Sequence, residues 1–173
     1  MAFNLFRHTI AASDLSGTLY SYDDNNNNAD PNLAAFGLQT AGNNMLSMLA
    51  QFKAVNSAIK ILGSSWSVPG WMKLNGVMDG TTVNNNLNSN YANSFAQYFV
   101  KYIQAFKNGG VNIDAITMQN EPLNSQAGYP TMYVAADQST SLIQNNVGPA
   151  LKAAGLSTEI WAYDHNTGKH ASE

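Results

Sequence analysis

The sequence predicts an α/β fold built on a parallel sheet. Short apolar, β-branched segments alternate with longer segments of helical periodicity, and this alternation occurs four times, less the last helix. Such an alternation favours parallel strands joined by right-handed crossovers. The 173 residues are 45% hydrophobic and 11% charged, which supplies apolar material for one domain or part of one.

Each predicted strand is a short apolar run that ends in a polar loop. The four runs span residues 3–10, 58–63, 113–121 and 158–163. The third run ends in a carboxylate, Glu121. Because Pro122 disfavours the helical region for the residue before it, we expect the backbone at Glu121 to stay extended, with its side chain at the strand end. In β/α proteins that end of the sheet is where chemistry occurs.

Three helices are predicted between and after these strands. The first is marked by apolar residues at helical spacing over 45–52, with Asn43 or Asn44 as its N-cap. The second, over 89–107, has the clearest apolar stripe and stops at a glycine pair. The third, over 135–154, contains Pro149, which removes a donor and is expected to kink or restart the helix.

Composition excludes several functional classes. The net charge is -3 and the eight Lys and Arg are scattered, so we expect no nucleic-acid partner. The absence of cysteine excludes disulfides and thiolate catalysis. His8, His165 and His170 have no ligand-like spacing with carboxylates, so neither a metal nor a cofactor is expected. No apolar run reaches the roughly 18 residues of a membrane span, and residues 1–10 lack the features of a signal peptide.

Four motifs at the strand ends are specific enough to name a family. They are Arg7-His8-Thr9-Ile10 with Ala12-Ser13-Asp14-Leu15-Ser16, Trp66-Ser67-x-Pro-Gly-Trp71-Met72-Lys73, Gln119-Asn120-Glu121-Pro122, and Trp161-Ala162-Tyr163-Asp164-His165-Asn166. In this order they resemble glycoside hydrolase family 30, and within it the fungal endo-β-1,6-glucanases. The resemblance covers about residues 3–167, and residues 168–173 no longer follow the pattern.

The resemblance implies a (β/α)8 barrel with a small β-sandwich beside it, in secreted, retaining enzymes that use two glutamates. Residues 1–173 would then form an incomplete TIM-barrel catalytic domain of about four βα units, the second to fifth strands of the barrel. The first strand, strands six to eight and the β-sandwich would be absent. Length agrees, because a full barrel takes about 250 residues. We expect an extracellular location from the resemblance.

Retaining glycoside hydrolysis needs two carboxyl groups about 5 to 5.5 Å apart. The resemblance makes Glu121 the general acid/base; the alternative is a surface carboxylate that caps a turn. The other glutamates are Glu159, at the start of the fourth strand, and Glu173, the last residue. The family's nucleophile follows the seventh strand, so we expect little or no activity from this chain alone.

Five further residues are candidates for binding sugar. The resemblance makes Asn120 a donor to the sugar 2-hydroxyl and Asp14 a ligand of sugar hydroxyls, while either is also a common turn residue. Trp66 resembles the family's sugar-site tryptophan, with a flat apolar face and one N–H donor. Tyr129 resembles a substrate-lining aromatic or anchors its loop. Trp71 is at least as well explained by packing.

Arg7, the only arginine, lies inside an apolar strand. A charge there is costly unless it is paired, so we expect a carboxylate partner, and the resemblance gives Arg7 a supporting role in the site. The alternative is a solvated charge at the strand edge. Asp164 and His165 end the fourth strand and are candidates for orienting Glu121 or contacting sugar, although such a pair is often structural.

The resemblance therefore implies a fragment of a retaining glycosidase that acts on β-1,6-glucan. Related barrels also handle β-1,4-linked xylan and glucosylceramide, so the linkage stays open. One alternative is a non-catalytic glucan-binding remnant that uses Trp66, Asp14 and Asn120. Another is a subunit that completes its barrel with a second copy or a complementary chain, because an open sheet leaves two edges and an exposed inner apolar face.

Overall fold

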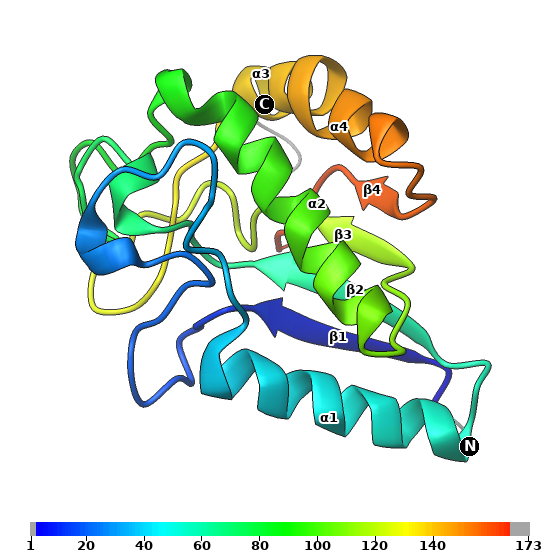
Figure 1. The fold of residues 1–173 in the computed structure, drawn as a ribbon. Helices are drawn as coiled ribbons and strands as arrows, with labels where there is room; N and C mark the ends of the chain where they lie inside the picture. The colour runs from blue at the N-terminus through cyan, green and yellow to red at the C-terminus, as the bar shows by residue number, and fades with distance from the viewer. Residues whose placement is uncertain (1–2, 167–173) are drawn as a thin grey trace.

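A computed structural model describes residues 3–166, which form a four-stranded parallel sheet with its helices alongside (Figure 1). The strand order is β1-β2-β3-β4, the order of the chain. The strands are β1 (Leu5–Ile10), β2 (Lys60–Ser65), β3 (Ala115–Thr117) and β4 (Glu159–Trp161). In register, Leu5 lies opposite Lys60, Leu62 opposite Ala115, and Ala115 opposite Glu159. The predicted α/β class with parallel strands is confirmed.

The helices follow one another along the sheet. In Figure 1, α1 runs beside β1, α2 crosses β2 and β3, and the α3–α4 segment lies beside β4. Their bounds are α1 (Gln39–Val55), α2 (Ala92–Asn108), α3 (Ala136–Leu142), the π-helical η4 (Ile143–Val147) and α4 (Gly148–Ala153), with short 3₁₀ turns η1 (Asn25–Asn27), η2 (Gly70–Met72) and η3 (Ser89–Tyr91). Three long loops connect strands to helices: the β1–α1 loop, residues 11–38, the β2–α2 loop, residues 66–88, and the β3–α3 loop, residues 118–135.

The prediction that Asn43 or Asn44 caps α1 is wrong. The helix begins at Gln39, so both asparagines lie within it, and the Asn43 side chain donates to the Gln39 carbonyl at 2.6 Å. The start is fixed by tertiary contact: the Gln39 amide side chain donates to the Ser21 carbonyl at 2.7 Å. The predicted interruption of the last helix is confirmed, because a π-helical stretch precedes α4 and a proline lies in the first turn of α4.

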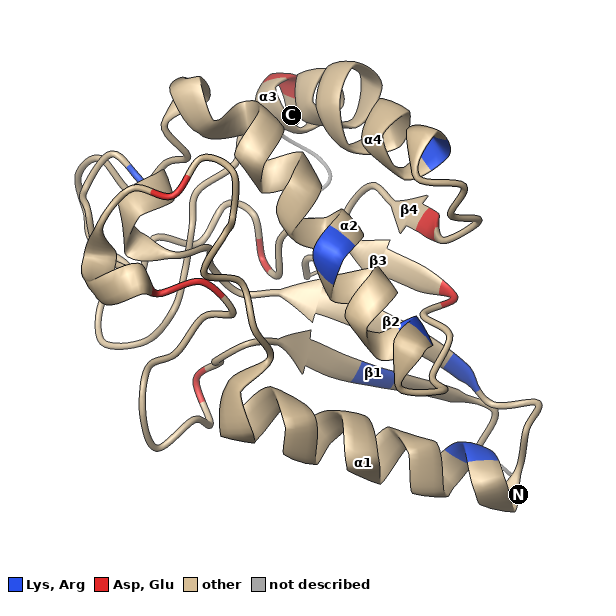
Figure 2. Cartoon of the chain, viewed as in Figure 1, with Lys and Arg blue, Asp and Glu red and all other residues tan. Residues whose placement is uncertain are grey.

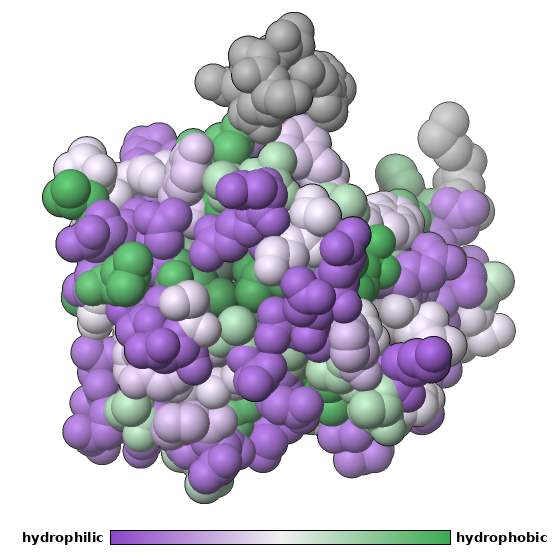
Figure 3. All heavy atoms as spheres, turned by 90° about the horizontal axis from the view of Figure 1, so that it is seen from above, coloured by the Kyte–Doolittle hydropathy of each residue, from purple (hydrophilic) through white to green (hydrophobic). Residues whose placement is uncertain are grey.

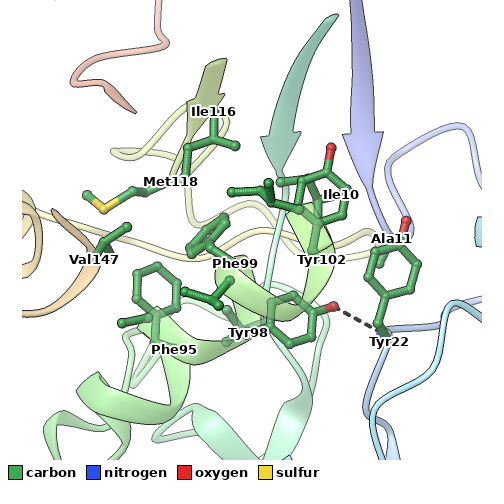
Figure 4. Packing of buried hydrophobic residues seen from close by; sticks show 14 of the residues in the cluster. Ile10, Ala11, Tyr22, Phe95, Tyr98, Phe99, Tyr102, Ile116, Met118 and Val147 are labelled. Carbon is green, nitrogen blue, oxygen red and sulfur yellow. Dashed lines mark hydrogen bonds between the residues drawn. The ribbon is translucent and has the colours of Figure 1, made fainter. Parts of the chain in front are cut away.

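The core packs the apolar stripe of α2 against β1, β2 and β3. Phe95, Phe99 and Tyr102 are fully buried there (Figure 4). Tyr102 needs the bare backbone of Gly63 in β2, where a Cβ would collide with its hydroxyl. That hydroxyl is 2.6 Å from Nε2 of His8. The close approach of α2 to the sheet therefore depends on a glycine in β2.

The opposite face of the sheet is polar near the strand ends. Arg7, Ser64 and Thr117 project there, and Ser64 Oγ lies 3.0 Å from Arg7 Nη2 and 2.7 Å from Thr117 Oγ1. The expectation of an exposed apolar inner face is correct only in part, because these strands also place hydroxyl and guanidinium groups on it. Exposed apolar side chains share this face, because Leu5 lies two residues before Arg7 in β1 and Trp161 lies opposite Thr117; they are 45% and 41% exposed.

The surface carries few charges. Figure 2 shows Lys and Arg dispersed over separate elements rather than gathered in a stripe. On the face seen from the α3 and α4 side, hydrophilic residues surround a hollow with apolar residues in it (Figure 3). Within residues 3–166, no helix is long and apolar enough to cross a bilayer.

Candidate active site

Glu121 lies in the β3–α3 loop just beyond the carboxyl end of β3. Its backbone has a φ of +45°, in the left-handed region, so the expectation of an extended backbone is wrong. Hydrogen bonds on both sides impose this turn: Glu121 N donates to the Asp164 carbonyl at 2.8 Å, and its own carbonyl accepts from Asn124 N at 2.8 Å. The preference imposed by the following proline is overridden by these contacts.

Both oxygens of the Glu121 carboxylate contact amide groups. Oε2 accepts from Nδ2 of Asn124 at 2.9 Å, and Oε1 lies 3.4 Å from Nδ2 of Asn166. Both donors are neutral amides, so the carboxyl group is oriented without a paired cation in the contacts it makes. The two amides therefore fix the direction in which the carboxylate points.

Arg7 of β1 connects this strand to the carboxyl ends of β2, β3 and β4. Its Nη2 donates to Asp164 Oδ2 at 2.8 Å, to Asn120 Oδ1 at 2.6 Å and to Ser64 Oγ at 3.0 Å. The expected carboxylate partner is thus confirmed as Asp164. The Arg7 and Asp164 side chains are 36% and 24% exposed, so the pair is only partly shielded from water.

Asp164 is the acceptor at the centre of this network. The hydroxyls of Ser64 and Thr117 each donate to its Oδ2 at 2.8 Å, in addition to Arg7. Burial raises the pKa of Asp164, but the hydrogen bonds from Arg7, Thr117 and Ser64 outweigh it and hold the pKa below its ordinary value. The carboxylate therefore stays ionised and anchors the guanidinium.

His165 does not share that network. Its Nδ1 accepts from Asn166 N at 2.7 Å, and its ring stacks on Tyr163 with centroids 5.8 Å apart. The Asp164 carboxylate bonds instead to Arg7, Ser64 and Thr117. Asp164 reaches Glu121 through its backbone carbonyl, so it supports the predicted acid/base residue from the main chain.

Asn120 is oriented by its neighbours. Its N donates to the Ser65 carbonyl at 2.6 Å, which ties the loop to β2. Because Oδ1 accepts from Arg7, the NH₂ group of the amide must point away from the guanidinium. That leaves Nδ2 as a donor at the carboxyl end of the sheet.

Trp66 and Tyr129 form an aromatic pair beside these polar groups. Their ring centroids are 6.1 Å apart at an interplanar angle of 64°, an edge-on arrangement. The Tyr129 hydroxyl accepts from Asn124 Nδ2 at 3.0 Å, and the same nitrogen donates to Glu121. Within the described part of the chain, the buried Nε1 of Trp66 has no hydrogen-bond partner. Asn124 thus couples the carboxylate to the aromatic pair.

Two candidates stand apart from this constellation. Trp71 is 6% exposed, donates to the Asp23 carbonyl at 2.9 Å and packs edge-on against Tyr91, as expected of a packing residue. Asp14 lies in an exposed turn after β1, and no hydrogen bond or ion pair joins it to the other candidates in residues 3–166.

Three residues of this network, Ser64, Thr117 and Asn124, were not predicted from the sequence. The two hydroxyls lie near the carboxyl ends of apolar strands, and that position was the available signal. Asn124 carries no comparable signal, because only the turn at Glu121 brings it to the carboxylate.

A large cavity lies at the other end of the sheet. It has a volume of about 720 Å³ and is lined in part by Lys60, Asp114, Glu159 and Trp161. Glu159 accepts from Trp161 there and lies at the start of β4, as expected. Because the polar groups around Glu121 project from the carboxyl ends, we place the site there rather than in this cavity.

No group of three or more His, Asp or Glu that could hold a metal ion occurs in residues 3–166. His170 and Glu173 lie outside the described residues.

A parallel β/α sheet with an oriented carboxylate, amide donors and an aromatic pair at its carboxyl end is the arrangement of a barrel-type enzyme that acts on a polar ligand. The chain belongs to glycosyl hydrolase family 30: the TIM-barrel domain of that family matches residues 1–170.

Fungal relatives cover nearly all of this chain. It is 62% identical to endo-1,6-beta-D-glucanase BGN16.3 of Trichoderma harzianum, over 96% of this chain and 36% of that protein. It is also 62% identical to endo-1,6-beta-D-glucanase neg1 of Aspergillus fumigatus, over 95% of this chain and 36% of that protein. Among solved structures, the endo-beta1,6-glucanase BT3312 superposes with a TM-score of 0.85 at 35% identity, over 95% of this chain and 36% of that one.

The chain therefore spans about a third of the length of these relatives. The fold corresponds to part of a (β/α)8 barrel, as the sequence predicted.

Proposed function

We propose that this chain carries the acid/base half of a retaining glycosidase site for β-1,6-linked glucan, with Glu121 as the general acid/base. The observation that carries this is the position of Glu121 at the carboxyl end of β3, next to an Asn120 amide oriented by Arg7. In a retaining reaction such a group first protonates the leaving oxygen and then, as a base, activates water. The identity to proteins named endo-1,6-beta-D-glucanases supports the substrate class.

The other residues have distinct proposed roles. The free NH₂ of Asn120 donates to the sugar 2-hydroxyl, a bond that strengthens as positive charge develops on the ring. Trp66 and Tyr129 offer aromatic faces and edges to sugar C–H groups. Asp14 contacts sugar hydroxyls from the turn after β1. Asp164 acts through Arg7 rather than on the sugar.

His165 is proposed to line the same face as Glu121, held by the ring of Tyr163. Its Nδ1 accepts from the Asn166 amide, so its Nε2 carries the proton and can donate to a sugar hydroxyl.

The second carboxylate is proposed to come from outside residues 3–166. Glu159 lies at the opposite end of the sheet, and Asp164 is bound by Arg7 and two hydroxyls. We therefore expect little or no turnover from this chain alone, because deleting one of two such carboxylates removes the nucleophile. A polymeric glucan does not cross a membrane, so we infer an extracellular place of action.

Two alternatives rest on specific observations. A glucan-binding role without turnover is favoured by the aromatic pair and the oriented Asn120, which need no second carboxylate. A subunit that associates with a second copy or a complementary chain is favoured by β1 and β4, which are the edges of the described sheet.

The test is release of reducing ends from a linear β-1,6-glucan, together with glucan affinity and the oligomeric state. We compare the chain with its Glu121→Gln variant and with Glu159→Gln, the same change at the opposite end of the sheet. Binding without turnover in all three agrees with the proposal. Turnover lost only in Glu121→Gln supports the acid/base role and refutes the predicted inactivity. Turnover that survives Glu121→Gln, or absence of glucan binding by the folded chain, refutes the proposed function.

A further inference from the structure

Lys73 is a buried lysine in the β2–α2 loop, only 3% exposed. A buried ammonium is costly unless its hydrogens are bonded. Its Nζ donates to three backbone carbonyls: Met78 at 3.0 Å, Asp79 at 2.9 Å and Thr131 at 2.8 Å. The first two belong to its own loop and the third to the β3–α3 loop. All three ammonium hydrogens are therefore used, and they join two segments that are far apart in the sequence.

The two loops also meet through their backbones around this lysine. Gly80 N donates to the Tyr129 carbonyl at 3.0 Å, and Tyr133 N donates to the Asn85 carbonyl at 2.8 Å. The approach at Gly80 is close, since a Cβ there would collide with the Thr131 hydroxyl. The Gly80 bond thus holds the main chain of Tyr129 two residues before Thr131, whose carbonyl accepts from Lys73.

The start of the β2–α2 loop is held at the same point. The Ser67 hydroxyl donates to the Met78 carbonyl at 2.7 Å, so this carbonyl accepts from both Ser67 and Lys73. Ser67 follows Trp66 directly. One ammonium therefore connects the backbone next to Trp66 with the backbone next to Tyr129.

We propose that Lys73 is a positioning residue that fastens the β3–α3 loop to the β2–α2 loop and so sets Tyr129 against Trp66 in the sugar site. That a sugar binds beside these two rings rests on the proposed function, whereas the link between the loops does not. Burial lowers the pKa of Lys73 to about 7, although the nearby Asp79 carboxylate raises it. An apolar side chain of similar length would fill the space without that cost, so what the ammonium adds is the directed link between the loops.

The cysteine-free chain allows this link to be removed and restored at one position. The Lys73→Cys variant is alkylated while unfolded and is then refolded. Alkylation with 2-bromoethylamine rebuilds a side chain of lysine length with an ammonium group, whereas alkylation with 1-bromopropane rebuilds the length without the charge. Lys152→Cys, on the exposed face of α4, is treated identically as the control. Hydrogen exchange is read at the Gly80 and Tyr133 amides, with the Asp114 amide at the far end of the sheet as reference.

We expect the aminoethylated Lys73→Cys variant to protect the Gly80 and Tyr133 amides as the unsubstituted chain does. The propylated form should lose protection by about tenfold or more, because each hydrogen bond from a charged donor contributes more than a tenfold change in the opening equilibrium. Lys73→Met, which needs no refolding, should show the same loss. The Asp114 amide and the Lys152→Cys forms should not change.

Full protection in the propylated form, or equal loss in both alkylated forms, would overturn the proposal. Affinity for a β-1,6-linked gluco-oligosaccharide is measured on the same samples and should fall with the protection. If no sample binds the oligosaccharide but exchange still follows the ammonium, the loop link is upheld and the proposed glucan function is what fails.

Discussion

Replacing Asp164 with asparagine removes the charge on which the polar network converges. Its Oδ2 accepts from Arg7, Ser64 and Thr117, all at 2.8 Å. A hydrogen bond to a charged group contributes about 1.5 to 3 kcal/mol, and partial exposure of the ion pair reduces the sum. We expect the free energy of unfolding at pH 7 to fall by about 2 kcal/mol. In urea this lowers the midpoint by roughly 1 M.

The control is Lys60→Gln, which breaks the ion pair with Asp114 on the exposed amino end of the sheet. Exposed pairs contribute little, so its midpoint should not move measurably. The folded pKa of Asp164 is lowered, so its contribution is present above the ordinary aspartate pKa and is lost as the pH falls through the folded pKa. The difference between Asp164→Asn and the unsubstituted chain should therefore vanish in acid. A midpoint shift no larger than that of Lys60→Gln would show that the Asp164 carboxylate does not stabilise the fold through this network.

Three further predictions concern buried groups. Burial lowers the pKa of His8 to about 4, so the His8 ring is neutral in the folded chain at pH 7. The stability that this neutral ring contributes is present above pH 6.5 and is lost as the pH falls to about 4, which lowers the free energy of unfolding by about 3 kcal/mol. An NMR titration of the His8 ring together with urea unfolding at each pH would check this. Burial raises the pKa of Asp23 to about 6, so the charged carboxylate destabilises the fold at pH 7. The Asp23→Asn variant should therefore melt at a higher temperature than the unsubstituted chain at pH 7 but not at pH 4. The absence of a higher melting temperature at pH 7 would contradict this. In Gly63→Ala the new methyl group collides with the Tyr102 hydroxyl, so the free energy of unfolding should fall by about 1 to 3 kcal/mol. Chemical denaturation should show no comparable loss for Gly17→Ala, because no atom beyond the adjacent residues lies within 4 Å of the added methyl group there.

The sequence was sufficient for the order and type of the main elements. All four predicted strands occur, although β3 and β4 are only three residues long each. Local periodicity locates such elements because side-chain burial repeats with the backbone geometry. The start of α1 at Gln39 was missed because a tertiary contact to Ser21, not a cap, fixes it.

The site was predictable where it depends on residue type and less so where it depends on long-range geometry. A lone arginine in an apolar strand required a carboxylate partner, but nothing local identified Asp164, which is 157 residues away. The left-handed turn at Glu121 depends on the same distant residue through its carbonyl. The contact between Asn124 and Glu121 follows from that turn and could not be predicted without it.

A glucan is expected to bind at the carboxyl end of this sheet, around Glu121. The three tryptophans provide a direct test, because Trp66 lies in the proposed site, Trp71 is packed in the core and Trp161 lines the cavity at the opposite end. We would titrate the chain with a β-1,6-linked gluco-oligosaccharide and follow the three indole N–H signals by NMR. We expect a saturable shift of the Trp66 signal with the Trp71 and Trp161 signals unchanged. A shift of Trp161 alone, or none at saturating oligosaccharide, would contradict it.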